Sequence, residues 1–165
     1  MRIAYTGMKH GWVGFHIDDI ETPYEFAASN VIIDCLFDLI DITIRLCEGE
    51  EEVFIEFWLE PASYLWHIVH KDKLLYIHHY FCNDSKLEIK INKNYLKGFS
   101  LEQTTETSLN IFADQVVRFL ETLLTEKTLQ EYQSTEAWGK EFPQDKFAKL
   151  KKLRPFLGGE NLPPV

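Results

Sequence analysis

The sequence predicts an α+β fold, an antiparallel β-meander of four to six strands with two long helices packed on one face and a short C-terminal helix. Three observations support this. Residues 53–92 alternate in polarity and are interrupted only at 61–63 and 71–73. Segments with helical periodicity flank this stretch on both sides. Pro143 and Pro155 bracket a last short helical pattern.

The meander divides into strands over about 53–60, 64–71, 74–82 and 86–92, with further strands at 11–17 and, more weakly, 2–6. In the strand at 53–60, apolar side chains face one way, and Phe54, Glu56, Trp58 and Glu60 face the other. The register stays open, because a one-residue change in the turn at 71–73 exchanges the cross-strand partners.

The first helix is predicted from about Tyr24, just after Pro23, to Glu48, with Gly49 at its end. Charged residues at spacings of three and four form a narrow stripe on it, which contains Asp34, Asp38 and Asp41. Apolar residues occupy more than half of its circumference. We therefore expect this helix to be covered on more than one side, either by a second helix or by a second chain.

The second helix is predicted from a capping box at Ser100–Gln103 and continues through an apolar face that extends from Leu109 to Leu124. A loop or short helix at 131–142 and a final helix at 144–153 follow. We expect a single domain over residues 1–157 and a flexible tail over 158–165.

The chain is acidic, with a formal charge of −9 and a pI of about 5.1. Nucleic acid is a poor partner for such a surface, whereas a basic protein is compatible with it. Residues 18–60 hold thirteen carboxylates and one cation, and residues 140–154 hold six cations. This asymmetry could steer a charged partner, or simply give a solvated surface.

Three cysteines without a paired spacing indicate reduced thiols, and the N-terminus lacks an apolar signal segment. Asp34, Asp38, Asp41 and Arg45 interrupt the apolar helix, which is therefore not expected to span a membrane. We expect a cytoplasmic protein.

No pattern typical of catalysis or cofactor binding stands out. His67, His70, His78, His79 and Cys82 gather on one predicted hairpin, but neighbouring strand residues point to opposite faces, so that only a pair such as His67 with His78 could share a metal. Glu56 and Glu60 could form an acid–base pair, although such spacing is common on any exposed sheet. We expect no cofactor, no metal and no enzymatic activity.

The face of the sheet that carries Phe54 and Trp58 is predicted to hold further aromatic residues. An exposed aromatic surface usually marks an interface. The alternative is that the N-terminal strands or the aromatic C-terminal segment cover this face, and the sequence leaves both possibilities open.

Four short motifs together resemble a pattern found in other proteins. They are Leu46-Cys-Glu-Gly49, Glu60-Pro-Ala-Ser-Tyr-Leu-Trp66, Ser108-Leu-Asn-Ile-Phe112 and the Trp138…Phe142-Pro143 segment. In their order these resemble a group of small acidic bacterial α+β proteins, mostly of unknown function. The overall style is similar to immunity proteins of bacterial toxin systems, which inhibit a toxin by binding it. The resemblance implies no catalytic residue.

We therefore expect a non-enzymatic protein-binding module, an immunity-type protein that masks a basic toxin. Charged groups would raise the association rate and aromatic groups would supply affinity. The alternatives are a small-ligand-binding protein or enzyme with a pocket between sheet and helices, and a homodimer formed through the first helix. The candidate partner-binding residues are Asp34, Asp38, Asp41, Glu50, Glu51, Glu52 and Trp58.

Overall fold

Seven strands and four helices build an α+β fold in a computed structural model that describes residues 1–83, 96 and 98–153. One antiparallel sheet has the order β1-β2-β3, and a second has the order β4-β5-β6-β7. The strands are β1 (Arg2–Lys9), β2 (Trp12–Asp18), β3 (Tyr24–Ser29), β4 (Glu52–Trp58), β5 (Ser63–Lys71), β6 (Leu74–Cys82) and β7 (Ser100–Ser108). The helices are α1 (Cys35–Cys47), α2 (Leu109–Glu126), α3 (Leu129–Gln133) and α4 (Gln144–Leu153).

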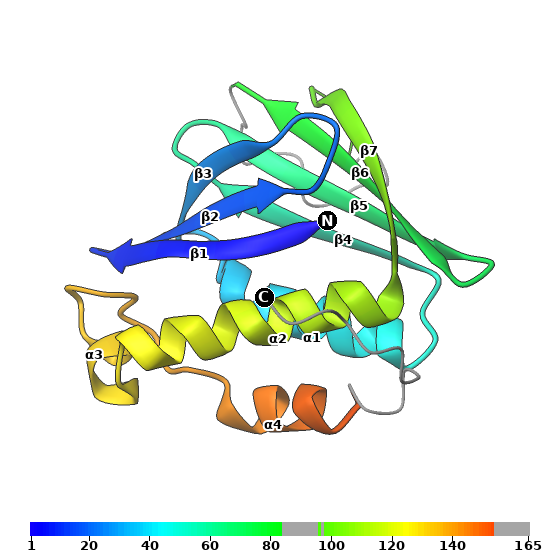
Figure 1. Cartoon of the computed structure of the whole chain (residues 1–165). Coiled ribbons are helices and arrows are strands. Elements are labelled where there is room, and N and C mark those ends of the chain that lie inside the picture. The colour runs from blue at the N-terminus through cyan, green and yellow to red at the C-terminus, as the bar shows by residue number, and fades with distance from the viewer. Residues whose placement is uncertain (84–95, 97, 154–165) are drawn as a thin grey trace.

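The elements form layers, as Figure 1 shows. The two sheets lie on one side of α1 and α2, and α4 lies on the opposite side of these two helices. Where the sheets meet, the rings of Phe15, Phe26 and Phe57 pack together with centroids 5.0 to 5.1 Å apart. Both sheets and the two long helices therefore share one hydrophobic core.

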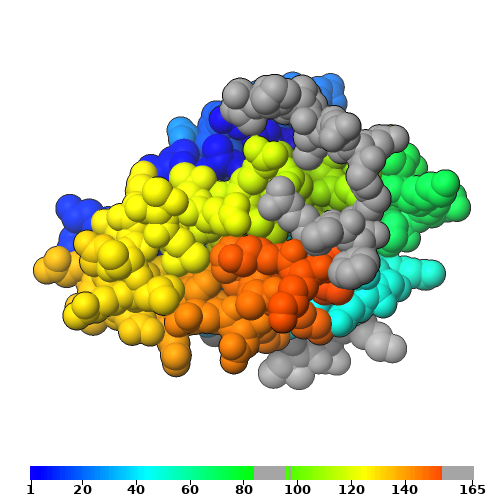
Figure 2. All heavy atoms as spheres, turned by 60° about the horizontal axis from the view of Figure 1, so that its bottom comes forward, coloured from blue at the N-terminus to red at the C-terminus, as the bar shows by residue number. Residues whose placement is uncertain are grey.

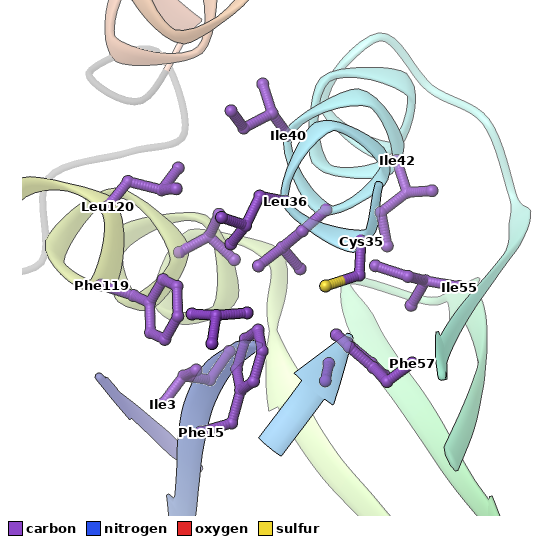
Figure 3. Close-up of a cluster of buried hydrophobic side chains, with 14 of the residues drawn as sticks. Ile3, Phe15, Cys35, Leu36, Ile40, Ile42, Ile55, Phe57, Phe119 and Leu120 are labelled. Atoms are coloured by element: carbon purple, nitrogen blue, oxygen red, sulfur yellow. The ribbon is translucent and has the colours of Figure 1, made fainter. Parts of the chain in front are cut away.

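Helix α1 lies at the centre of that core (Figure 3). Its Cys35 and Ile42 lie on the side of Ile55 and Phe57, and its Leu36 lies toward α2. Eight of its thirteen residues are buried. As expected, this helix with its wide apolar arc is covered on more than one side. Elements of the same chain do this, because β4, α2 and α4 all contact α1.

The prediction of one helix over residues 24–48 was wrong at its N-terminal part. Residues 24–29 form β3, which pairs with β2 in a register that places Phe26 opposite Phe15. Phe26 and Ala28 are buried while Glu25 and Ala27 are exposed, which is the two-residue period of a strand. Asp34 begins the helix instead, since its side chain accepts a hydrogen bond from the Phe37 backbone amide.

The predicted capping box at Ser100–Gln103 was also wrong, because these residues belong to β7. Ser108 caps α2, and its side chain accepts from the backbone N–H of Ile111. A true capping box stands at Thr128 and Glu131, at the start of α3. The predicted strand at 86–92 and the predicted tail at 158–165 lie outside the described residues.

The α+β class is confirmed, whereas the layout of one sheet with two long helices on its face is not. The N-terminal strands make a sheet of their own. Other predictions hold, since β4, β5 and β6 match three strands of the meander, and α4 spans residues 144–153. Gly49 follows α1 with a φ of 97°, a conformation that glycine adopts without strain.

Candidate functional site

The predicted acidic stripe of α1, Asp34, Asp38 and Asp41, is largely engaged within the chain. Asp34 caps the helix and its Oδ1 also accepts a hydrogen bond of 3.2 Å from the indole N–H of Trp138. Trp138 is fully buried. Asp34 therefore joins the start of α1 to the segment before α4, and Asp38 is half-buried one turn along.

Asp41 takes part in the contact between α1 and α4. Its carboxylate accepts a hydrogen bond from the ammonium of Lys146 and lies 4.0 Å from Arg45. Glu48, two turns further along α1, pairs with Lys149 at 2.5 Å. Figure 2 shows α4 on the face of the molecule beside α2. The basic segment near the C-terminus is thus the partner of acidic residues on α1.

The acidic loop, Glu50, Glu51 and Glu52, leads from α1 into β4. Glu50 forms two hydrogen bonds with the guanidinium of Arg45, at 2.7 and 2.5 Å. This bond lowers the pKa of Glu50 and raises that of Arg45. Glu51 is exposed, and Glu52 lies 2.7 Å from the Nε2 atom of His67. The backbone carbonyl of Glu51 also accepts a hydrogen bond from the His70 amide. Glu51 and Glu52 are therefore bonded to β5, whereas Glu50 is bonded to α1.

The β4–β7 sheet has one face toward α1, which carries Val53, Ile55 and Phe57. We call the opposite face the outer face. Strand alternation and register define its members. Its rows are Glu52, Val69, Tyr76 and Glu106; Phe54, His67, His78 and Thr104; Glu56, Leu65, Tyr80 and Leu101; and Trp58, Ser63 and Cys82.

Rings and imidazoles form the centre of the outer face. Phe54 stacks on His67 with centroids 4.3 Å apart and planes 7° from parallel. The rings of His67 and His78 lie 5.4 Å apart in directly paired positions, so the register left open by the sequence is one that brings these two residues together. His78 also bonds to the Thr104 hydroxyl at 2.8 Å, and burial lowers its pKa. Contacts from β5 and β7, the strands on either side of β6, therefore hold His78 in place within this row.

The two histidines do not assemble a larger ligand set. Among the described residues, no group of three or more His, Cys, Asp or Glu side chains is arranged to hold a metal ion. His79, one residue further along β6, is buried on the opposite face of the sheet, as the strand period requires.

Trp58 lies on the outer face but is only 8% exposed. It shares its row with buried Ser63 and Cys82. Its indole N–H is buried and has no hydrogen-bond partner in the described part of the chain. Trp58 thus shares its face with Phe54 but lies at the buried end of that face.

Glu56 and Glu60, the candidate acid–base pair, have different partners. Glu56 accepts a hydrogen bond from Ser63 at 2.8 Å, and Glu60 accepts one from Ser29.

Sequence reasoning missed the β7 side of the outer face, because residues 100–103 were assigned to a helix. A usable signal was the β-branched threonines at 104, 105 and 107, a residue type that favours strands. In the structure Thr105 and Thr107 are buried and alternate with exposed Thr104 and Glu106. It also missed Leu101, whose side chain is 53% exposed.

Comparison with known proteins found no matching family model, no matching curated protein and no matching solved structure. A membrane-crossing helix, long and apolar throughout, does not occur in the described part of the chain.

Proposed function

We propose that this chain is a non-enzymatic protein-binding module that takes a basic protein on the outer face of the β4–β7 sheet. In biological terms we propose an immunity-type role, in which the bound protein is a toxin and binding masks it. The observation that carries the proposal is the combination of half-buried rings with carboxylates on one sheet face.

The chemistry of the outer face suits such a partner. Phe54, Tyr76 and Tyr80 are half-buried there, and Leu101 is exposed. Aromatic groups of this kind supply most of the affinity at the centre of an interface. Glu52 of β4 and Glu106 of β7 lie at the two ends of the row that holds Val69 and Tyr76. Carboxylates at that position favour Lys and Arg of a partner and raise the association rate.

The acidic stripe of α1 is a weaker candidate for the same role. Asp34 and Asp41 are bonded to Trp138 and Lys146, and a partner would have to compete with those groups. We therefore assign partner steering to Glu51 and Glu52 rather than to the stripe.

The test begins with capture of a partner from source cells by the tagged protein, followed by purification of what is captured. Binding is then measured for the wild type, for Phe54→Ala and for the matched control Asp41→Asn. Phe54→Ala should raise the Kd by about tenfold or more, a loss of about 1.4 kcal/mol. Asp41→Asn should leave the Kd unchanged.

A second arm tests electrostatics. Replacing Glu51 and Glu52 with Gln should slow association and flatten its salt dependence, because the charges act at long range. The captured protein should also be basic and should harm cells that lack this chain. Equal binding by Phe54→Ala and wild type would remove the outer face from the proposal, and a harmless partner would remove the immunity role.

A further inference from the structure

Four polar side chains, one from each of four strands, form a continuous hydrogen-bonded chain between the two sheets. The indole N–H of Trp66 lies 3.0 Å from the Tyr24 hydroxyl oxygen. That oxygen lies 2.6 Å from Nδ1 of His79, and Nε2 of His79 lies 3.0 Å from the Thr105 hydroxyl. Trp66 and His79 are fully buried, and Thr105 is 6% exposed.

The order of donors along this chain follows from its first member. An indole N–H can only donate, so the Tyr24 oxygen accepts from Trp66. The Tyr24 hydroxyl hydrogen is then directed to Nδ1 of His79, which must carry no proton. The proton of the neutral imidazole is therefore on Nε2, from which it donates to Thr105. The other tautomer would aim two donors at the Tyr24 oxygen and leave its own hydrogen unpaired.

We propose that Tyr24, Trp66, His79 and Thr105 form an acid-sensitive latch that holds β3 against the β5–β7 strands while His79 is neutral and loosens when His79 takes a second proton. Protonation at Nδ1 converts the acceptor of the Tyr24 hydroxyl into a donor. The Tyr24–His79 bond in its present direction is then lost, and a charged imidazolium stands in the interior.

The groups around His79 favour the neutral form. It faces Tyr24 from β3, Trp66 from β5, and Thr105 and Gln103 from β7, all of which are uncharged. His78, on the other face of β6, would add repulsion when charged, and the carboxylate of Glu102 acts on Tyr64. Burial lowers the pKa of His79 from 6.5 to about 4 and raises that of Tyr24.

The sheets share a second contact close by that does not titrate. The Gln103 side chain donates to the Thr22 carbonyl at 2.9 Å and accepts from the Thr22 amide at 3.2 Å. Tyr24 also stacks on Tyr64, with centroids 5.0 Å apart. Acid should therefore act first on the hydrogen bonds of the latch, and the exchange of β3 amides should report it.

The sign of the pH dependence follows from linkage. The folded chain binds the His79 proton less readily than the unfolded chain, so this group destabilises the fold progressively as pH falls. The stability that neutral His79 contributes to the folded state is fully present above pH 6.5 and is lost between about pH 6.5 and 4. Over that interval the folding equilibrium constant should fall by between about two and three powers of ten from this residue.

The experiment compares urea unfolding between about pH 7 and 4 for wild type, His79→Gln and His78→Gln. A glutamine amide can accept from Tyr24 and donate to Thr105, and it binds no proton in this range. His79→Gln should lose far less stability in acid than wild type. His78→Gln, which removes an imidazole from the outer face of the same strand, should keep most of the wild-type loss of stability in acid, because burial rather than His78 is the main cause of the lowered His79 pKa. Amide exchange of β3 should accelerate in acid in the wild type and much less in His79→Gln.

If His79→Gln does not fold, nitrogen NMR spectra of the imidazole groups of the wild type can still test the proposal. They should show Nε2 protonated and Nδ1 bare at neutral pH, with titration near pH 4. Titration of His79 near 6.5, or the same acid dependence in wild type and folded His79→Gln, would overturn the latch.

Discussion

Helix α1 and the outer face of the β4–β7 sheet both carry carboxylates, yet they use them differently. On α1, Asp41 and Glu48 pair with Lys146 and Lys149 of α4. On the outer face, Glu52 and Glu106 stand beside half-buried rings. The difference shows that a run of like charges can divide into a part that joins elements of its own chain and a part that faces outward.

The two regions also differ in what stabilises them. Helix α4 buries Phe147 and Leu150, and the lysine–carboxylate pairs lie at the rim of this apolar contact. Exposed ion pairs contribute up to about 1 kcal/mol each, whereas burying a large apolar side chain contributes several times more. We infer that apolar packing holds α4 in place and that the charges align it.

The largest expected effect comes from breaking that packing. Phe147→Ala should reduce the free energy of unfolding by about 3 to 5 kcal/mol, because its ring is 4% exposed and packs edge-on against Phe142. Phe54→Ala on the outer face should cost less than about 1 kcal/mol. Urea unfolding of both variants makes the comparison. A similar cost for both would show that the outer face is part of the stabilising core.

A smaller effect is expected at the start of α1. Asp34→Ala should reduce the free energy of unfolding by about 1 to 2 kcal/mol, because it removes the helix cap and the acceptor of the Trp138 indole N–H. Asp34→Asn keeps an acceptor and should cost clearly less. Thermal or urea unfolding can measure the two variants. Equal stability of Asp34→Ala and wild type would leave Asp34 available for a partner after all.

The charge pairs between α1 and α4 should contribute less again. A double-mutant cycle of Lys146→Ala and Asp41→Asn should give a coupling free energy of about 0.2 to 1 kcal/mol that shrinks at high salt. The Lys146 ammonium also lies 4.5 Å from the centre of the Phe37 ring. That contact cancels in the cycle, so it should add to the cost of the single Lys146→Ala change and not to the coupling. A coupling of zero at low salt would contradict the pairing.

The smallest effect on stability is expected at the outer face. Glu52→Gln should change the free energy of unfolding by no more than about 0.5 kcal/mol, because its side chain is 60% exposed. Urea unfolding near neutral pH measures it. A loss above 1 kcal/mol would mean that Glu52 acts mainly as the partner of His67 within the fold.

Sequence reasoning worked best where a local signal agreed with the tertiary structure. The meander from β4 to β6, the end of α1 at Gly49 and helix α4 were all predicted. Trp58 and Phe54 were correctly placed on the same sheet face. These elements carry their periodicity and their end signals within a few residues, so no distant contact is needed to define them.

It worked least well where a distant partner overrides local preference. Residues 24–29 include Glu and two Ala, which favour a helix, yet they pair with β2. Residues 100–107 resemble a helix start, yet they pair with β6. Strand pairing depends on what lies alongside, and the sequence pattern does not record it.

The α+β class, the acidic character and the alternating faces of the meander can all be read from the amino-acid sequence, because composition and short-range periodicity encode them. Which charged and polar groups meet is set by the folding of the chain in three dimensions. It brought Lys146 to Asp41 across 105 positions and Tyr24 to His79 across 55. Electrostatic and hydrogen-bonding partners are set by distances in space, which sequence separation does not measure.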